Sequence, residues 1–199
     1  MASSIEPARF RQGAGRPCLD FIRTLRHRGT PQAAEELASP VDLAAWIRQC
    51  GPGEITSATR QPDAPQLQQA RALREAIHEL IQTARARGGT TASRPAVRNH
   101  VNDAAAHPVP APSLQASGGI EWHADDPVTA TLALIARDAL DLVTSPAIAR
   151  VRDCAGPRCG ALFLDTSRPG TRRWCSMATC GNRAKKDALR TRGTASEAG

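Results

Sequence analysis

Residues 153–186 read DCAGPRCGALFLDTSRPGTRRWCSMATCGNRAKK and contain four of the six cysteines of the chain. Four residues separate Cys154 from Cys159, four separate Cys175 from Cys180, and fifteen lie between the two pairs. Two short cysteine pairs at such a separation are typical of a structural zinc site. The reason is geometric, because a tetrahedral ion with Zn–S bonds of about 2.3 Å needs each pair to turn tightly toward one point.

Other uses of the four cysteines fit the sequence less well. The opening segment MASSIEPARFRQG lacks the apolar stretch of a signal peptide, so we expect a cytoplasmic protein, and structural disulfides are rare in that compartment. A redox-catalytic pair more often has two intervening residues. An iron–sulfur cluster or a redox switch are the remaining alternatives. The pattern favours one structural Zn²⁺ ion, with Cys154, Cys159, Cys175 and Cys180 as its ligands.

The residues around the cysteines predict the shape of this module. Gly156-Pro157 is suited to a tight knuckle at the first pair. The segment ALFLDTSRPGTRRW is predicted to form a hairpin, with Leu162–Leu164 extended, a turn at Ser167–Gly170 and a return strand at Arg172–Trp174. Ser176 can cap a helix that begins with the second pair. A knuckle, a hairpin and a helix make a treble-clef-like or ribbon-like zinc module. We expect its small core to include Met177, Ala184, Ala188 and Leu189.

The positive charge of the chain is concentrated in the same region. Residues 1–149 contain 15 arginines and 15 acidic residues, whereas residues 150–192 contain 11 basic and 3 acidic residues, against a net charge of +7 for the whole chain. Such a distribution is the electrostatic footprint of a protein that binds a phosphate backbone, although a solvated surface is the ordinary alternative. We therefore predict a nucleic acid as the partner. The predicted contacts are Arg172, Arg173, Arg183, Lys185, Lys186 and Arg190.

The rest of the chain reads as an alanine-rich helical domain. Only 34 of the 199 residues are Leu, Ile, Val or Phe, but 36 are alanines, mostly in stretches with helical spacing. Charged residues interrupt the longest apolar run, so no membrane span is expected. Helices are predicted at 18–27, 40–50, 65–87, 93–106 and 127–144, with a hairpin at Gly118-Gly119.

The predicted fold class is mainly α. Residues 1–147 form an N-terminal helical domain with a short β-hairpin. Residues 148–192 form the small treble-clef-like or ribbon-like zinc module, and residues 193–199 form a disordered tail.

The module resembles the bacterial CGNR zinc-finger family over residues 150–190. RRWCS at 172–176, FLDTS at 163–167 and the tetrapeptide Cys180-Gly181-Asn182-Arg183 carry the resemblance. It implies that the four cysteines occupy the metal positions of the family. Because Asn182 lies next to a ligand, a structural role is favoured over a contact with a base.

The N-terminal stretch GRPCLDFIRTL at 15–25 is similar to the opening of the helical ABATE domain, which commonly precedes this finger. The ABATE domain is described as a stress-induced transcriptional regulator. Arg23 stands where that domain usually has Asn. The resemblance implies DNA-binding transcriptional regulation, with double-stranded DNA as the partner.

Two other hypotheses remain. The chain could be a small-molecule-binding protein or an enzyme in which the zinc module is only a structural staple, with a pocket lined by Arg74, Glu75, His78 and Glu79. The five histidines lack ligand or triad spacing and no phosphate loop or nucleophile elbow occurs, so we expect no enzymatic activity. Alternatively, the module could bind RNA or protein, although its scarce aromatic residues argue against stacking on single strands. The helical domain is expected to sense a small-molecule effector or to form a homodimer.

Overall fold

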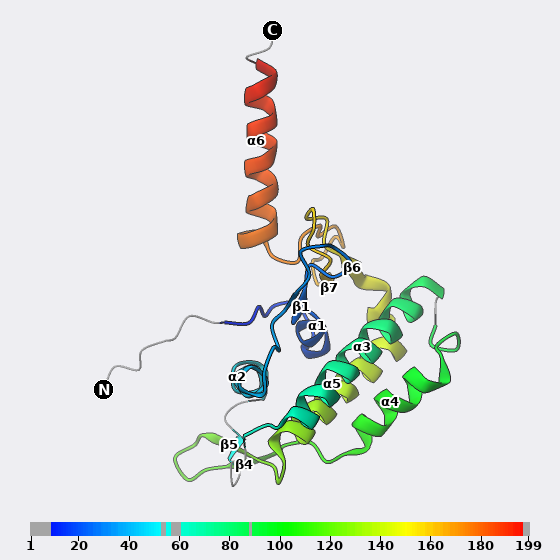
Figure 1. Ribbon diagram of the computed structural model, residues 1–199, viewed down its shortest axis with the longest axis vertical. Helices are drawn as coiled ribbons and strands as arrows, with labels where there is room; N and C mark the ends of the chain where they lie inside the picture. Colours follow the sequence, from blue (N-terminus) through cyan, green and yellow to red (C-terminus); the bar gives the residue numbers. More distant parts are fainter. Residues whose placement is uncertain (1–8, 53–54, 57–60, 88, 197–199) are drawn as a thin grey trace.

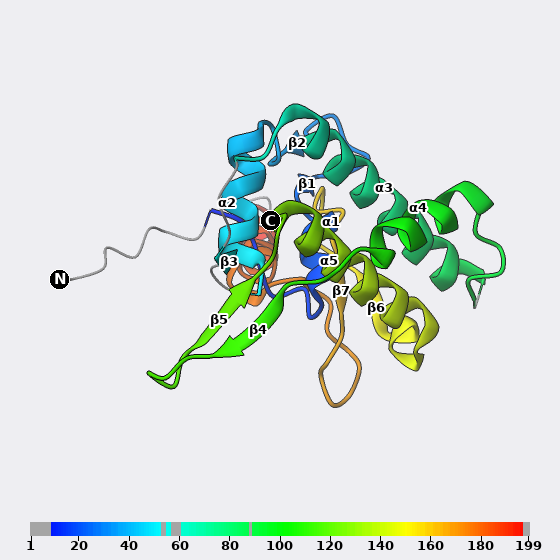
Figure 2. The same ribbon diagram turned by 90° about the horizontal axis from the view of Figure 1, so that it is seen from below.

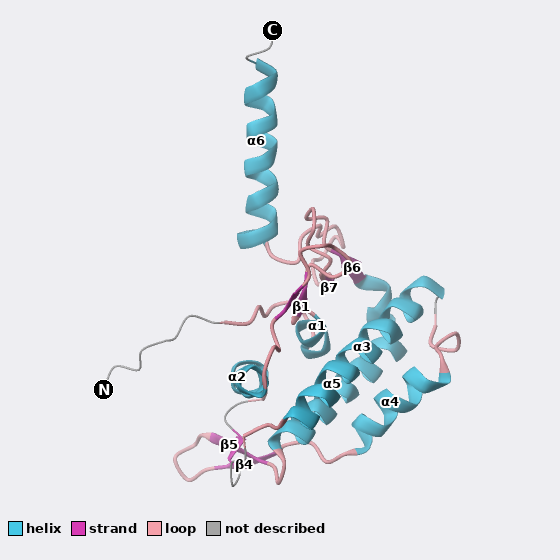
Figure 3. Cartoon of the chain, in the orientation of Figure 1, coloured by secondary structure: helices cyan, strands magenta, loops and turns pink. Residues whose placement is uncertain are grey.

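Helices make up most of the computed structural model, which describes residues 9–52, 55–56, 61–87 and 89–196 (Figure 3). The helices are α1 (Pro17–Ile22), α2 (Pro40–Cys50), α3 (Ala64–Arg87), α4 (Pro95–Ala106), α5 (Pro127–Thr144) and α6 (Asn182–Ser196), with a 3-10 turn η1 (Pro146–Arg150) and a π-turn η2 (Met177–Gly181). The strands are β1 (Leu25–Arg26), β2 (Ala34–Glu35), β3 (Ile55–Thr56), β4 (Ala111–Leu114), β5 (Ile120–His123), β6 (Val151–Asp153) and β7 (Leu162–Leu164). None of the helices in the described parts of the chain combines the length and the hydropathy that a transmembrane span requires.

Helices α3, α4 and α5 pack side by side and form the centre of the body (Figure 1). The apolar positions predicted for α3 recur every three or four residues, and the structure buries all of them: Leu67, Ala70, Leu73, Ile77, Leu80 and Ile81. The apolar positions predicted for α5 are likewise buried: Leu132, Ile135, Ala136, Ala139, Leu142 and Val143. Helical periodicity alone therefore located the main core.

Helix α2 begins and ends as its sequence predicts. Ser39 caps it, since its side chain accepts a hydrogen bond from the Asp42 amide while the Asp42 carboxylate accepts one from the Ser39 amide at 2.7 Å. This reciprocal capping box satisfies two amides that the first helical turn leaves unpaired.

The predicted helix at 18–27 is too long. Helix α1 ends at Ile22, and Leu25–Arg26 instead form β1, which pairs with β2 in an antiparallel ladder. The Thr24 amide and hydroxyl both donate to the Phe21 carbonyl, at 3.1 and 2.8 Å. Such a local side-chain bond competes with continuation of the helix. Helix α4 also starts later than predicted, at Pro95 rather than residue 93.

The hairpin predicted at Gly118-Gly119 is confirmed. Strands β4 and β5 pair antiparallel, with Leu114 opposite Ile120, and Gly118 adopts a φ of +84° in the turn. Figure 2 shows the hairpin projecting from the body. Strand β3 pairs with β5 in parallel, an addition that the sequence did not predict.

The C-terminal segment departs from the predicted tail. Helix α6 continues to Ser196, so residues 193–196 are helical, and residues 197–199 lie outside the described part of the chain. Figure 1 shows α6 projecting away from the other helices.

The zinc module and the helical body share one hydrophobic core. Phe163 and Leu164 of β7 lie in the same buried cluster as Phe21 of α1. The Leu164 amide donates to the Ala14 carbonyl at 2.7 Å, and a Cβ atom at Gly15 would lie only 3.0 Å from the Leu164 Cβ atom. The two parts are therefore in close backbone contact.

This arrangement corrects the predicted core of the module. Met177 is 52% exposed, Leu189 is 65% exposed, and Ala188 is also exposed. Ala184 is only half-buried. The module obtains its core from β7 and the helical body instead, because α6 points away from both.

Candidate metal centre

The first cysteine pair lies in the turn between β6 and β7. The two strands pair antiparallel, with Val151 opposite Leu164, and Cys154 follows β6 directly. The Cys154 amide donates to the Ala161 carbonyl at 2.9 Å, and the Cys159 amide donates to the Gly156 carbonyl at 3.0 Å. These bonds close a tight knuckle that turns both thiols to one side.

The predicted hairpin within residues 161–174 is wrong. Strand β7 pairs with β6 and not with Arg172–Trp174, which form no strand in the described structure. The carbonyl of Arg173 accepts a hydrogen bond from the Ala155 amide at 2.9 Å, so the returning segment bonds to the knuckle. This bond brings the second cysteine pair to the first.

The second pair lies at the start of the C-terminal helix. Ser176 caps η2, as predicted, by accepting a hydrogen bond from the Thr179 amide at 3.3 Å. Cys180 lies within η2, and α6 follows directly. A thiolate near the N-terminus of a helix is stabilised by the helix dipole, which favours metal binding.

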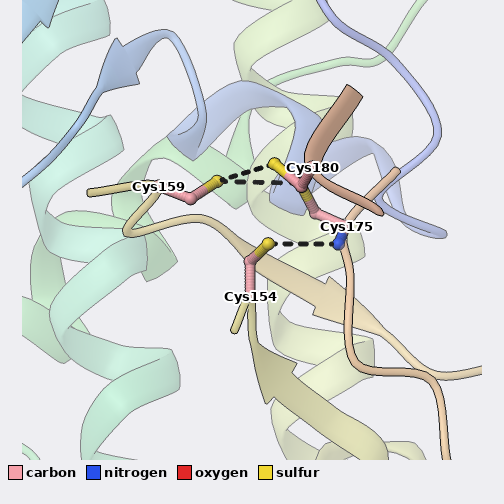
Figure 4. A group of neighbouring side chains, drawn as sticks. All are labelled: Cys154, Cys159, Cys175 and Cys180. Carbon is pink, nitrogen blue, oxygen red and sulfur yellow. Dashed lines mark hydrogen bonds between the residues drawn. The ribbon is translucent and has the colours of Figure 1, made fainter. Parts of the chain in front are cut away.

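The four sulfur atoms converge on one point (Figure 4). The Sγ atom of Cys175 lies 3.7 Å from those of Cys159 and Cys180, which are 3.6 Å apart, and all four Sγ atoms lie within 4.8 Å of one another. A tetrahedral Zn²⁺ ion with bonds of about 2.3 Å places its sulfur ligands about 3.8 Å apart. The spacing of the thiols thus fits this ion.

Electrostatics also favour a cation at the centre. Hydrogen bonds from Cys159 and Cys175 lower the pKa of Cys154, whereas the contacts with Cys154 and Cys159 raise the pKa of Cys175. Thiols packed this closely cannot all ionise, because the thiolates repel one another. A divalent cation removes that repulsion and allows all four to act as thiolate ligands.

Asp165 orders the loop between the two cysteine pairs. Its buried carboxylate accepts hydrogen bonds from the hydroxyl and amide of Ser167, at 2.6 and 2.9 Å, and from the Arg172 amide at 3.0 Å. The hydrogen bond from the Ser167 hydroxyl is the main cause of the lowered pKa of Asp165. Sequence reasoning missed this role, although Asp followed two residues later by Ser is a signal for such a turn.

Arg172, which was predicted to contact DNA, is placed within the module. Its Nε atom donates to the Trp174 carbonyl at 2.8 Å, and its Nη2 atom donates to the Cys175 carbonyl. The guanidinium lies 4.7 Å from the centroid of the Phe163 ring. These contacts hold the backbone next to a metal ligand.

Replacing Arg172 with Gln should therefore destabilise the module. Two hydrogen bonds from a charged donor and one cation–π contact are lost, so we expect the free energy of unfolding to fall by about 1–3 kcal/mol. The matched control is Arg173→Gln, whose exposed side chain lies 5.2 Å from the Trp174 ring and makes no hydrogen bond within the described structure, so it should change stability by at most about 1 kcal/mol. Urea unfolding of both variants measures the difference. Equal stability would show that Arg172 has no structural role.

The remaining predicted DNA contacts are exposed. Arg173 lies beside the metal centre, and Arg183, Lys185 and Lys186 lie along α6. Arg190 forms an ion pair with Asp187 at 3.9 Å on the same helix. The structure thus separates the predicted set into one internal arginine and five cationic side chains at the surface.

Two residues singled out in the sequence have structural contacts. The Asn182 side chain donates to the Ala178 carbonyl at 3.2 Å, in agreement with the structural role predicted for it. Arg23 is buried in α1's C-terminal turn, where its guanidinium contacts the Asp20 carboxylate at 3.1 Å. That carboxylate also accepts hydrogen bonds from the amides of Gly13 and Ala14.

Comparison with known proteins gives two family matches. Residues 15–146 match the ABATE family model, described as "Putative stress-induced transcription regulator", and residues 150–193 match the model of the CGNR zinc finger. No curated protein matches the chain. Together with the sulfur geometry, the second match identifies one structural zinc ion held by the four cysteines.

Proposed function

This chain belongs to the ABATE family and carries a CGNR zinc finger, and from this premise we propose that it is a cytoplasmic, DNA-binding transcriptional regulator. The observation that carries the proposal is the exposed basic helix α6, which is anchored at one end to the zinc centre. The helical domain would then sense an effector or form a homodimer.

The dimensions and side chains of α6 support the proposal. A helix of 15 residues is about 22 Å long, and a helix fits the major groove of B-DNA, which is about 12 Å wide. Arg183, Lys185 and Lys186 are exposed on it. Arginine can bind phosphate or a guanine edge through two parallel hydrogen bonds. Because the zinc centre fixes the N-terminal end of α6, the charges would approach DNA from a defined direction.

Three of the four residues behind the enzyme hypothesis have ion-pair partners, whereas His78 lines a small pocket between the helical body and the zinc module. Arg74 forms a buried ion pair with Glu35 at 2.6 Å and contacts Glu75 at 2.9 Å, while Glu75 also pairs with Arg28 and Glu79 with Arg94. These ion pairs join α3 to neighbouring segments. We therefore propose that they have a structural role and that the zinc finger contacts DNA.

The proposal is tested by selecting the duplex DNA that the protein binds from a random pool at physiological salt. We expect an enriched motif whose binding weakens with salt, with a slope of log K against log [salt] of about −4.5 if the five surface cations each contact a phosphate. Fluorescence anisotropy at several salt concentrations measures the slope. Binding that is insensitive to salt, or that is equally tight on single-stranded RNA, would contradict the proposal.

A further inference from the structure

An open cleft of about 310 Å³ lies in the helical domain, where α4 meets α3 and α5. The buried side chains of Leu73 on α3 and Leu132 on α5 line it. Sites for small ligands usually have volumes of about 300–1,000 Å³ and combine apolar walls with a few polar groups, and they occur between the helices of bundles. The cleft has the size for a small ligand, on the order of one ring with its substituents.

Four polar side chains at the cleft have no hydrogen bond or ion pair among the described residues: Gln69, His100, Asp103 and His107. His100 and Asp103 lie three residues apart on α4 and so share one face of the helix, and His107 follows as the capping residue at its C-terminal end. All four side chains are exposed, so water rather than protein satisfies them when no ligand is bound. The four uncommitted groups supply donors and acceptors that a ligand can use.

The charge of the cleft limits the class of ligand. The carboxylate of Asp103 lies at the cleft, whereas no arginine or lysine is among the described residues that line it, in a chain with 24 arginines. Arg137, on the same helix as Leu132, donates instead to the carbonyls of Ala105 and His107, both at 2.8 Å. An anionic ligand would meet a carboxylate and no cation, which disfavours phosphates and carboxylic acids.

We propose that this cleft binds a small, flat molecule that carries amine or amidine donors and at most one positive charge. The leucine side chains contact its apolar face, the carboxylate of Asp103 accepts hydrogen bonds from its donors, and the imidazoles and the amide of Gln69 bind its remaining polar groups. The binding site stands independently of DNA binding, and only its use as an effector site rests on the proposed function.

Two aromatic probes of opposite charge test the site. The full zinc-loaded chain, labelled with ¹⁵N, is titrated by NMR with benzamidine and separately with benzoate, in the absence of DNA. We expect benzamidine to shift the amide resonances around the cleft in a saturable manner, and benzoate to bind at least about tenfold more weakly, since it repels the carboxylate. Equal binding of both probes, or no saturable shift with benzamidine, would overturn the proposal.

The variant Asp103→Asn identifies the group responsible. It should weaken benzamidine about tenfold, which corresponds to the loss of one charge-assisted interaction. Asp103 is exposed and unpaired among the described residues, so the variant should keep the fold. The matched control Asp125→Asn, at an exposed carboxylate outside the cleft lining, should bind as the wild type does. If both variants bind equally, Asp103 is not the recognition group and the proposal fails. Because no DNA is present in this titration, a failure of benzamidine binding says nothing about the proposed DNA binding. Equally, a failure of DNA binding leaves the cleft proposal standing.

Discussion

Replacing Cys175 with Ser is expected to abolish zinc binding and to unfold the zinc module. The Cys175 Sγ atom lies 3.7 Å from two of the other sulfur atoms, so the variant removes a central ligand. Structural zinc contributes about 10–16 kcal/mol in zinc-finger peptides, which is comparable to the whole stability of an ordinary domain at about 5–15 kcal/mol. The module contains too little apolar core of its own to compensate for this loss.

The effect should extend into the helical body. Phe163 is fully buried in the shared core, and the Leu164 amide donates to the Ala14 carbonyl. Unfolding of the module would expose this part of the core and remove the ion pair between Arg85 and Asp153. We therefore expect the melting temperature of the helices to fall together with the loss of zinc.

Metal analysis and thermal melts followed by circular dichroism measure both effects. The wild type should contain one zinc ion per chain, and Cys175→Ser should contain less than about a tenth of that amount. Cys50→Ser is the matched control, because Cys50 is a half-buried thiol at the end of α2 and lies outside the sulfur cluster. It should keep its zinc. If Cys175→Ser melts at the wild-type temperature, the helical body does not depend on the module.

Neutralising the basic side chains of α6 is expected to reduce DNA affinity by a factor on the order of 10² to 10³. The variant carries Gln at four positions: Arg183, Lys185, Lys186 and Arg190. If each cation contacts one phosphate, its removal lowers the salt slope by about 0.9, so the slope should become shallower by about 3.6. Gln has a helix propensity close to that of Arg and Lys, so the helix itself should persist.

The control variant carries a single Gln, at a position on the helical body away from α6. Arg48 is exposed on α2, on the helical body, and Arg48→Gln should leave both affinity and salt slope unchanged. Zinc content and circular dichroism must match the wild type in both proteins, which separates lost charge from lost fold. A fourfold variant that keeps the wild-type salt slope would show that α6 does not contact the phosphates.

Local patterns in the sequence were sufficient for several elements. Ser39 followed by Pro40 identified the start of α2, because an N-cap residue and a proline at the first helical position are adjacent in the chain. The periodic apolar positions of α5 identified its buried face between Leu132 and Val143. The predicted helix at 18–27 was too long because the Thr24 hydroxyl donates to the Phe21 carbonyl, a local bond that competes with the helix. Helix propensity does not account for such a side-chain bond.

The zinc site could be predicted because the type and spacing of its ligands are visible in the sequence. Four thiols in two short pairs are typical of a zinc site, and each pair is brought together by a turn of only a few residues. The contacts that hold the zinc site in place were harder to predict from the sequence. Asp165 and Arg172 act on backbone groups of their own loop, and an arginine in a basic segment gives no sign that carbonyl oxygens satisfy its donors.

The sequence by itself determined the helical composition, the zinc ligands and the location of the positive charge, because each depends on residue types and on spacings of a few positions. Only the tertiary structure decided that β7 pairs with β6, that the module shares its core with the helical body, and that α6 stands exposed. It alone placed uncommitted polar groups around a cleft between α3, α4 and α5. These features depend on contacts between residues far apart in the chain, and a pattern within one segment carries no information about which distant segment will cover it.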